Sequence, residues 1–412
     1  MNPRLIPLHL FLILLLHFSC SASGYANITV SKTWTMDADI TQVQDLNLTG
    51  FFIANNSFQR VLSIQSNAQL GQEGETLTVH YSGPAANRTV IYARALVEVH
   101  YPQEFQSDPA LLPCQSPQPI KISSIASSLS SPTLLPTLAA ITEWVYNNLT
   151  YDIAYMGKPA TPEEVLASRT GVCTHYASIA AAFLDSLCIQ HRMVSGYAMQ
   201  NGTFQPHAWL EADIGENVPM DPTFGEAGPL SAERIISYYW TNSPDDVADS
   251  LSFTCSHQPG VSGCNPGAVS MDTSFSAEVL SYRDFDALAK IEPTYEPQSG
   301  RLSMNLSNPS SKNLLLTYRF TSAPSTYGQD MRVLSIGPAQ SRTFAYPLDT
   351  SELGDGFAYT IPYRAQAQGT QCDQSISFSM ASGRDSGNPL CQPAFLLLIV
   401  SACILYSRKS AK

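Results

Sequence analysis

The spacing of apolar residues changes twice along this 412-residue chain, and no other feature constrains its fold as strongly. In residues 25–105 apolar residues stand at every second position, as in "GETLTVHYSG" and "RTVIYARALVEVHY". Such alternation, with Asn and Gly between the runs, predicts the short antiparallel strands of a β-sandwich. Alternation returns from about Ala277 to Met380, as in "NLLLTYRFTS", and predicts a second sandwich.

Between the two alternating regions the apolar spacing becomes helical. In "TLAAITEWVYNNL" the residues Leu138, Ile141, Val145 and Leu149 recur at intervals of three or four, as on one buried face of a helix. A Pro/Ser-rich stretch, residues 108–133, precedes this helix and is interpreted as a linker.

A second helix is predicted in "TPEEVLASRTG". Thr161 is its N-cap, Pro162 opens the first turn, and Glu164 stands three residues after the cap, which is the pattern of a capping box. Gly171 is expected to stop this helix.

A third helix is predicted from Cys173 onward, followed by strand-like runs in "HRMVSGYAM" and "HAWLEAD". The buried stripe of this helix is expected to comprise Tyr176, Ile179, Ala180, Phe183, Leu184 and Leu187.

Both ends of the chain carry apolar segments. Residues 1–24 combine a positive start, an apolar run and small residues, which is typical of a signal peptide. Residues 390–406 form an uncharged run followed at once by Arg and Lys, which favours a transmembrane helix with a cytoplasmic basic end. A cleaved sorting tail and a buried helix are the alternatives. The body of the protein is expected outside the cell, anchored in the membrane by a single span.

Composition agrees with an exported protein. Asn-x-Ser/Thr tripeptides, which are glycosylation acceptors, occur at Asn27, Asn47, Asn55, Asn87, Asn148, Asn201 and Asn305. Charged residues make up only 14% of the chain and the net charge is −12. An acidic chain without a basic stripe argues against nucleic acid as a partner. The oligomeric state stays open.

Nine cysteines have to be assigned in an oxidising compartment. Cys255 and Cys264 flank a short Pro/Gly loop and are the first choice for a disulfide. Cys372 with Cys391 is the second choice, and Cys114 has no clear partner. Cys188 is interpreted as a buried thiol at the end of the third helix. Cys173 is left over.

Cys173 has the sequence context of a nucleophile. A helix N-terminus stabilises a thiolate, because free N–H groups and aligned peptide dipoles favour negative charge there. An imidazole can then transfer the proton, and a carboxylate can orient that imidazole. His207 lies 34 residues after Cys173 and Asp221 lies 14 residues after His207, so they share a pocket only if neighbouring strands pack against the helix. No paired Cys/His spacing predicts a metal, and no cofactor is expected.

Two other histidines compete with His207 for the role of base. His175 is two residues from Cys173 and should point to a different helix face, and His191 lies in the loop after the helix. Trp209 is interpreted as packing rather than as a substrate platform. Arg192 and Glu211 are interpreted either as an ion pair or as solvated strand ends.

The order of motifs in about residues 135–230 resembles the transglutaminase-like superfamily, which has a papain-like cysteine-enzyme core. The motifs are G-x-C, an aromatic-Ala opening an apolar helix, R-x-V-x-G-Y, H-A-W-x-E and D-P-T. The matching residues are Gly171, Cys173, Tyr176, Ala177, Arg192, Val194, Gly196, Tyr197, His207, Ala208, Trp209, Glu211, Asp221, Pro222 and Thr223.

The resemblance implies a catalytic triad in which Cys173 is the nucleophile, His207 the base and Asp221 the orienting acid. It leaves the second oxyanion donor open, with Trp144 and Tyr151 as candidates beside the backbone N–H of Cys173. The implied function is a cell-surface cysteine enzyme that acts on amide bonds of a protein or peptide through an acyl-thiol, either as a hydrolase or as an acyltransferase. The alternative is a non-catalytic binding or structural module, which a disulfide between Cys173 and Cys188 would favour.

These expectations combine into an α+β architecture, a papain-like transglutaminase core flanked by two β-sandwich domains. The expected segments are a signal peptide (1–24), a first sandwich (25–107), a linker (108–133), the core (134–275), a second sandwich (276–381) and a transmembrane helix (390–406).

Overall fold

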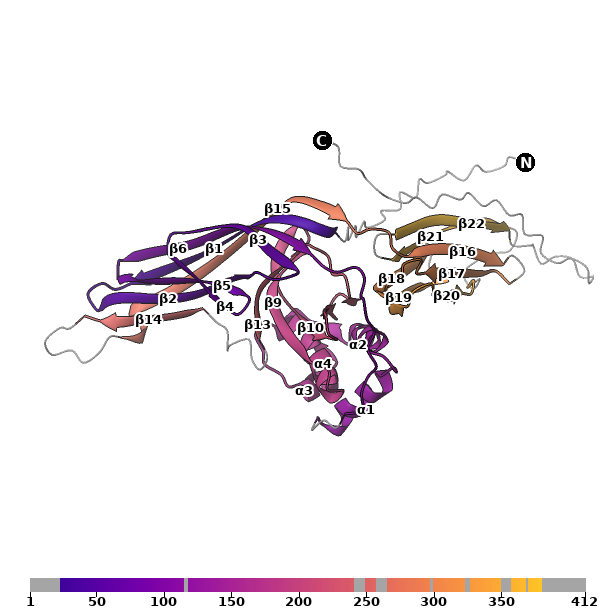
Figure 1. Ribbon diagram of the computed structural model, residues 1–412, viewed down its shortest axis with the longest axis horizontal. Coiled ribbons are helices and arrows are strands. Elements are labelled where there is room, and N and C mark those ends of the chain that lie inside the picture. The colour runs from indigo at the N-terminus through magenta and orange to yellow at the C-terminus, as the bar shows by residue number, and fades with distance from the viewer. Residues whose placement is uncertain are drawn as a thin grey trace, which may run out of the picture.

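The computed structural model contains two β-sandwiches and an α/β core that lies between them (Figure 1). It describes residues 23–114, 118–240, 249–256, 265–296, 299–322, 327–349, 357–367 and 370–379. The arrangement agrees with the expected core and flanking β domains.

The first sandwich is built from two four-stranded antiparallel sheets that share one apolar core. One sheet has the order β15-β1-β6-β3, with β15 Val269–Asp284, β1 Ser23–Ala38, β6 Arg88–His100 and β3 Gln59–Ser66. The other has the order β14-β2-β5-β4, with β14 Ser250–Cys255, β2 Val43–Ala54, β5 Thr76–Pro84 and β4 Gln69–Glu73. Alternate residues of these strands are buried, which is the reason for the spacing in the sequence.

Strands β14 and β15 reach the first sandwich from beyond the core in sequence. β15 pairs with β1 from Val269 to Asp284, and β14 pairs with β2. The expected boundary at residue 276 divides β15 and assigns its second half to the other sandwich. The pairing places all of β14 and β15 in the first sandwich, because alternation identifies a strand but not the sheet that the strand joins.

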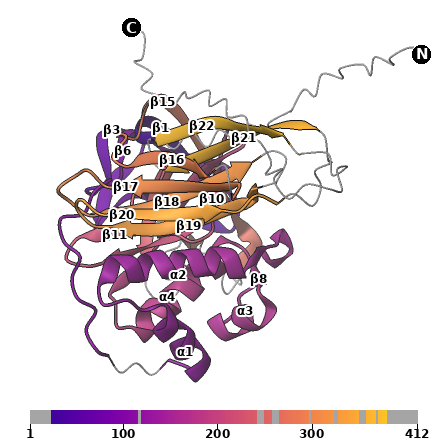
Figure 2. The same cartoon turned by 90° about the vertical axis from the view of Figure 1, so that its right-hand side faces the viewer.

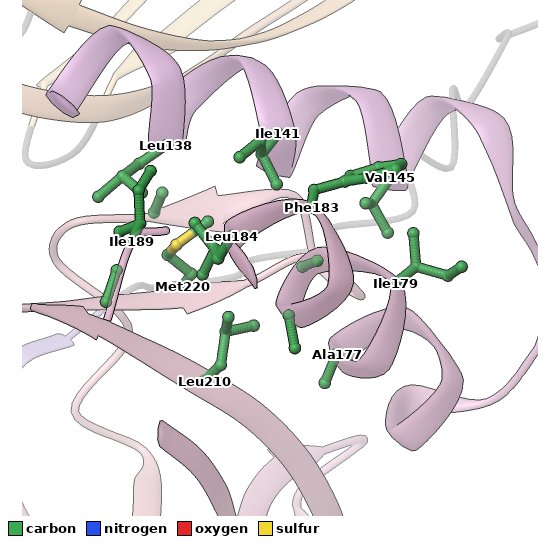
Figure 3. Packing of buried hydrophobic residues seen from close by; sticks show 14 of the residues in the cluster. Leu138, Ile141, Val145, Ala177, Ile179, Phe183, Leu184, Ile189, Leu210 and Met220 are labelled. Atoms are coloured by element: carbon green, nitrogen blue, oxygen red, sulfur yellow. The ribbon is translucent and has the colours of Figure 1, made fainter. Parts of the chain in front are cut away.

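The core packs four helices against a five-stranded sheet. The helices are α1 Ile120–Leu129, α2 Leu134–Asn148, α3 Pro162–Ser168 and α4 Cys173–Ser186. The sheet has the order β12-β11-β10-β9-β13, with β9 His191–Gln200, β10 Thr203–Asp213, β11 Asn217–Asp221, β12 Glu226–Ala227 and β13 Arg234–Trp240. Figure 3 shows Ile141 and Val145 of α2, Phe183 of α4 and Leu210 of β10 meeting in the apolar layer between α2, α4 and the sheet.

Short elements connect these helices. β7 (Thr150–Tyr151) pairs in parallel with β8 (Thr170–Gly171), and a 3₁₀ turn, η1, covers Ile153–Tyr155. The capping box of α3 is present, since the Thr161 and Glu164 side chains each bond the other residue's backbone N–H. α3 does not stop at Gly171: it ends at Ser168, and Arg169 takes the left-handed conformation at φ 57°.

The segment interpreted as a linker contains α1. Ile122 and Ala126, one turn apart, are fully buried against the core, while the serines of "IKISSIASSL" cover the outer face. The Ser-rich composition did not predict this helix, because its buried face consists of only two side chains, Ile122 and Ala126.

A disulfide joins the part of this former linker that precedes α1 to the core. Cys114 pairs with Cys188 just after α4, with Cα atoms 5.9 Å apart. The interpretation of Cys188 as a buried thiol is thus wrong, because the residue is exposed at the helix end. Cys255 is also disulfide-bonded, while its expected partner Cys264, and Cys391 of the second expected pair, lie outside the described residues.

The second sandwich consists of a three-stranded and a four-stranded sheet around their own core. The smaller sheet has the order β16-β17-β20, with β16 Lys290–Glu296, β17 Arg301–Ser307 and β20 Ser341–Tyr346. The larger has the order β19-β18-β21-β22, with β19 Gln329–Ile336, β18 Leu314–Ser322, β21 Ala358–Ala367 and β22 Thr370–Ser379. Figure 2 shows β19 running along α2, and Leu315 and Val333 belong to the apolar cluster of the core.

The predicted signal peptide and the predicted transmembrane helix lie almost wholly outside the described residues. Ser23 and Gly24 of the expected signal peptide begin β1, and its remaining residues and the expected transmembrane helix at 390–406 are outside the described residues. Among the helices in the described part of the chain, none is both long and apolar enough to span a membrane.

Candidate active site

Cys173 is the first residue of α4, and its position depends on how this helix begins. Val172 precedes it in an extended conformation, and the Val172 N–H donates to Nδ1 of His175 at 3.1 Å. Gly171 is needed here, because a Cβ atom at that position would lie 2.5 Å from the Cβ of His175. The thiol of Cys173 is free and partly exposed at the positive end of the helix.

His207 and Asp221 come from neighbouring strands of the core sheet, β10 and β11. Nε2 of His207 lies 2.8 Å from Oδ2 of Asp221, and the two residues are 5% and 0% exposed. The ring of His207 packs near Trp209, whose ring centre is 5.8 Å away at a shallow angle, and near Phe224, whose ring centre is 5.2 Å away and edge-on. These two aromatic contacts restrict the orientation of the imidazole.

The charge state of His207 is set by its neighbours. Burial alone would lower its pKa, but the Asp221 carboxylate and a hydrogen bond to Cys173 raise the pKa of His207 to about 9. Burial alone would raise the pKa of Asp221, but the positive charges of His207 and Arg234 lower it. The three predicted residues, Cys173, His207 and Asp221, thus lie together in one site.

Arg234 and Glu226 also belong to this site, although the sequence reading did not identify them. Arg234 donates to Oδ2 of Asp221 from Nε at 3.1 Å, and its Nη2 lies 3.0 Å from the same oxygen. The same Nη2 donates to Oε2 of Glu226 at 2.7 Å. Arg234 is 4% exposed, and the one signal of it in the sequence is an Arg that opens the apolar run "RIISYYW".

Of the two candidate oxyanion donors, Tyr151 contacts the nucleophile segment. Burial and the Cys173 side chain raise the pKa of Tyr151, and a hydrogen bond between its hydroxyl and the Cys173 backbone opposes this rise. Trp144 instead packs edge-on against Phe183 at 5.1 Å and lies under the guanidinium of Arg169 at 4.8 Å.

The competing histidines have other partners. His175 is buried, accepts at Nδ1 from the Val172 N–H, and donates from Nε2 to the Lys158 carbonyl at 3.0 Å. It therefore joins the segment after Tyr151 to the start of α4. His191 follows the opposite end of α4, with Nδ1 donating to the Ile189 carbonyl at 3.2 Å.

Three other residues of the motifs, Arg192, Trp209 and Glu211, make structural contacts. Arg192 and Glu211 form an ion pair at 2.9 Å, with Glu211 1% exposed, so the ion-pair alternative holds. Arg192 also reaches Glu75 of the first sandwich at 3.1 Å. Trp209 is fully buried and packs in the apolar cluster of the first sandwich, so it has no surface for a substrate.

Within the described ranges no three His, Cys, Asp or Glu side chains are grouped as metal ligands. A cavity of about 380 Å³ lies between α2 and β19, with Glu143, Trp144 and Arg342 in its wall.

Comparison with known proteins agrees with the motifs. A family model described as the transglutaminase-like superfamily matches residues 123–222, and a search of curated proteins finds no match. A solved structure of a proposed cysteine protease from Cytophaga hutchinsonii is similar, at 17% identity and a TM-score of 0.44, covering 64% of this chain and 93% of that one. A red sea bream transglutaminase has 9% identity and a TM-score of 0.22, covering 87% and 80%. Scores this low carry no inference about the reaction. Residues 123–222 of the chain thus match the transglutaminase-like superfamily, in the same region as the motifs.

Proposed function

We propose that this protein is a cysteine-dependent enzyme that acts on amide bonds of proteins or peptides through an acyl-thiol intermediate. The observation that carries the proposal is the position of His207, which is hydrogen-bonded to the buried Asp221 carboxylate and lies near enough to Cys173 for that thiol to raise its pKa. Transglutaminase-like enzymes act on protein or peptide substrates, and the family match of residues 123–222 supports the same general kind of substrate here.

The proposed reaction has two stages. In the first, the thiol proton is already held by His207, whose pKa is raised to about 9, and the Cys173 sulfur attacks the carbonyl carbon of the amide, which gives a tetrahedral oxyanion. The oxyanion collapses, the C–N bond breaks, and His207 returns the proton to the departing amine. The product left on the enzyme is a thioester of Cys173.

In the second stage another nucleophile attacks the thioester. His207 takes a proton from water or from a primary amine, a second oxyanion forms, and the sulfur leaves and recovers its proton. Water yields a carboxylic acid, whereas an amine yields a new amide. We favour hydrolysis slightly, and the two outcomes differ only in this second nucleophile.

For the oxyanion we propose the backbone N–H of Cys173 and the hydroxyl of Tyr151 as donors. Tyr151 lies near enough to Cys173 for both the side chain and the backbone of that residue to shift the pKa of Tyr151. A substrate carbonyl oxygen in this position would accept from the N–H and from the hydroxyl.

The test is a panel of peptides and denatured proteins. Full-length protein is assayed for new amino termini, for released ammonia, and for incorporation of a fluorescent primary amine. Activity in any of these that disappears in Cys173→Ala supports the proposal. Cys372→Ala is the matched control, since it removes a buried thiol of the second sandwich.

A second measurement tests the nucleophile without a substrate. Iodoacetamide should alkylate Cys173 faster than a simple free thiol, and His207→Ala should remove this advantage. Alkylation at the ordinary rate, together with inactivity on the whole panel, would leave a non-catalytic module as the better description.

We further propose that the protein works outside the cell as a membrane-anchored glycoprotein. Two disulfide-bonded cysteines of the first sandwich and core, Cys255 and Cys188, suit an oxidising compartment. Among the acceptor asparagines, Asn55, Asn87, Asn148 and Asn201 are exposed. A shift in mass on endoglycosidase treatment, and release from membranes on deletion of residues 390–412, are the expected results.

A further inference from the structure

We propose that Arg234, held by Glu226, is a positioning residue that shares the Asp221 carboxylate with His207 and so sets how firmly that carboxylate holds the imidazolium. This inference rests on the proposed roles of His207 and Asp221. Neither Arg234 nor Glu226 belongs to the motifs that carry the family resemblance.

The geometry makes Asp221 a shared acceptor. Its Oδ2 receives Nε2 of His207 at 2.8 Å and Nε of Arg234 at 3.1 Å, whereas its Oδ1 receives only the Thr223 N–H, at 3.2 Å. Two cationic donors on one oxygen compete for the same negative charge. Each therefore weakens the hold of the carboxylate on the other.

Charge balance explains why Glu226 is present. Asp221 and Glu226 carry two negative charges and Arg234 carries one positive charge, so this buried group is neutral only when His207 is protonated. Since buried charge without compensation is costly, the balance favours the imidazolium. Without Glu226, Arg234 would pair with Asp221 alone. The Asp221 carboxylate would then stabilise the His207 imidazolium less.

Other charged or titratable groups that face this cluster come from several elements. They are Cys173 of α4, which lies near His207, Glu233 beside Arg234, and Tyr101, which lies near Arg234, Asp221 and Glu211. Phe224 packs on two members of the cluster, since its ring lies 5.1 Å from the Arg234 guanidinium and 5.2 Å from the His207 ring. Within this cluster, neutralising Arg234 removes a positive charge and neutralising Glu226 removes a negative charge, so the two substitutions should have opposite effects on His207.

The experiment is a titration of the His207 ring by NMR of histidine-labelled full-length protein in a Cys173→Ala background. The chain has eight histidines, and His207→Gln assigns the signal. Arg234→Gln should move the midpoint to higher pH, by about one unit, because Asp221 then serves His207 alone. Glu226→Gln should move it to lower pH by about one unit, and the double variant should lie near the parent.

Two controls separate this effect from general damage. Arg234→Lys keeps the charge and should titrate close to the parent. Arg192→Gln breaks another buried ion pair of the same sheet, that with Glu211, and should leave the midpoint of His207 in place. Shifts of both charge variants in one direction, or shifts no larger than that of Arg192→Gln, would overturn the inference. If Arg234→Gln does not fold, an unshifted Glu226→Gln overturns it alone.

The titration does not depend on turnover. Opposite shifts in a protein that cleaves and transfers nothing would support the shared carboxylate while refuting the enzyme. An active enzyme whose Arg234→Gln and Glu226→Gln variants titrate like the parent would retain the proposed function without this role for Arg234.

Discussion

His207 is a buried base whose charge is stabilised by folding, and this makes the stability of the protein depend on pH. Its pKa is raised from 6.5 to about 9 in the folded chain, by Asp221 and Cys173 against the effect of burial. A raised pKa contributes stability that is fully present below about pH 6.5 and is lost as the pH rises through about 9.

The expected result concerns the difference in unfolding free energy between the parent and His207→Gln. This difference should shrink by about 3 kcal/mol between pH 6 and pH 10, since one pKa unit corresponds to about 1.4 kcal/mol. Denaturant titrations at several pH values measure it. His191→Gln, at the far end of α4, serves as the control, and a difference that stays constant with pH would contradict the assignment.

Tyr151 gives a second prediction at the scale of one side chain. Tyr151→Phe should lower kcat about 100-fold, because one oxyanion donor is lost, while alkylation of Cys173 stays unchanged. Tyr155→Phe is the matched control, since Tyr155 packs edge-on against His175 and has no contact of this kind with Cys173. An equal loss in both variants would point to a disturbed segment rather than to a lost donor.

Residue types and order were enough to select Cys173, His207 and Asp221 as candidates, and these side chains lie together. Arg234 could not be identified from the sequence, because its role depends on how the strands pair. It stands 13 residues from Asp221, and the strand order β11-β10-β9-β13 brings the two side chains to within 3.1 Å. The same applies to His175, whose spacing excluded it from the face of Cys173 but gave no hint of its bond to the Lys158 carbonyl.

At the scale of elements, the disulfide between Cys114 and Cys188 ties the segment before α1 to the end of α4. It closes a loop with a sequence separation of 74, so the double variant Cys114→Ser/Cys188→Ser should lose about 4 kcal/mol of unfolding free energy. Tryptophan fluorescence in denaturant follows the core through Trp144. Cys173→Ser is the control, and an equal effect of the two would count against the constraint.

Gly196 lets β13 approach β9 closely. A Cβ atom there would lie 2.0 Å from the backbone oxygen of Ile235, so Gly196→Ala should force the strands apart and cost about 1–3 kcal/mol. Thermal unfolding measures the loss. Gly267→Ala, where a Cβ has its nearest neighbour at 3.5 Å, should be nearly neutral, and equal stability of the two variants would contradict the steric argument.

Helices and strands with a regular spacing of apolar residues could be predicted from the sequence. Elements that depend on distant contacts could not. α2, α3 and α4 follow from apolar spacing and caps, and the start of α4 at Cys173 was anticipated. α1 was missed because Ile122 and Ala126 are its only fully buried apolar residues. β15 was recognised as a strand over its second half, yet its partner β1 lies about 250 residues earlier, and no local pattern encodes such a pairing.

At the scale of the whole molecule, the second sandwich holds the loop that follows Asp221. Arg319 of β18 donates to the Phe224 carbonyl at 2.7 Å, and Thr317 donates to the Gly225 carbonyl at 2.9 Å. Gly228 lies so close to β18 that a Cβ would meet the Leu315 oxygen at 2.5 Å. The position of Phe224 against His207 therefore depends on a domain that contributes no side chain to the site.

Arg319→Ala should loosen this loop without unfolding either domain. Loss of a charged hydrogen bond predicts amide exchange about tenfold faster or more across residues 222–228, with a lower kcat as a consequence. Hydrogen-exchange mass spectrometry measures the first effect. Arg342→Ala, an exposed residue of β20, is the control, and unchanged protection in Arg319→Ala would show that the loop holds itself.

The route of the chain through the first sandwich has a consequence for synthesis on the ribosome. β1 and β2 emerge early, but their partners β15 and β14 follow only after the whole core, about 150 residues beyond β6. At about 5–20 residues per second, the nascent sheets wait for about 8–30 s with an open edge, a period in which they are prone to pair with other chains. The arrival of these late strands covers the edges of β1 and β2, and it anchors both ends of the core at one place.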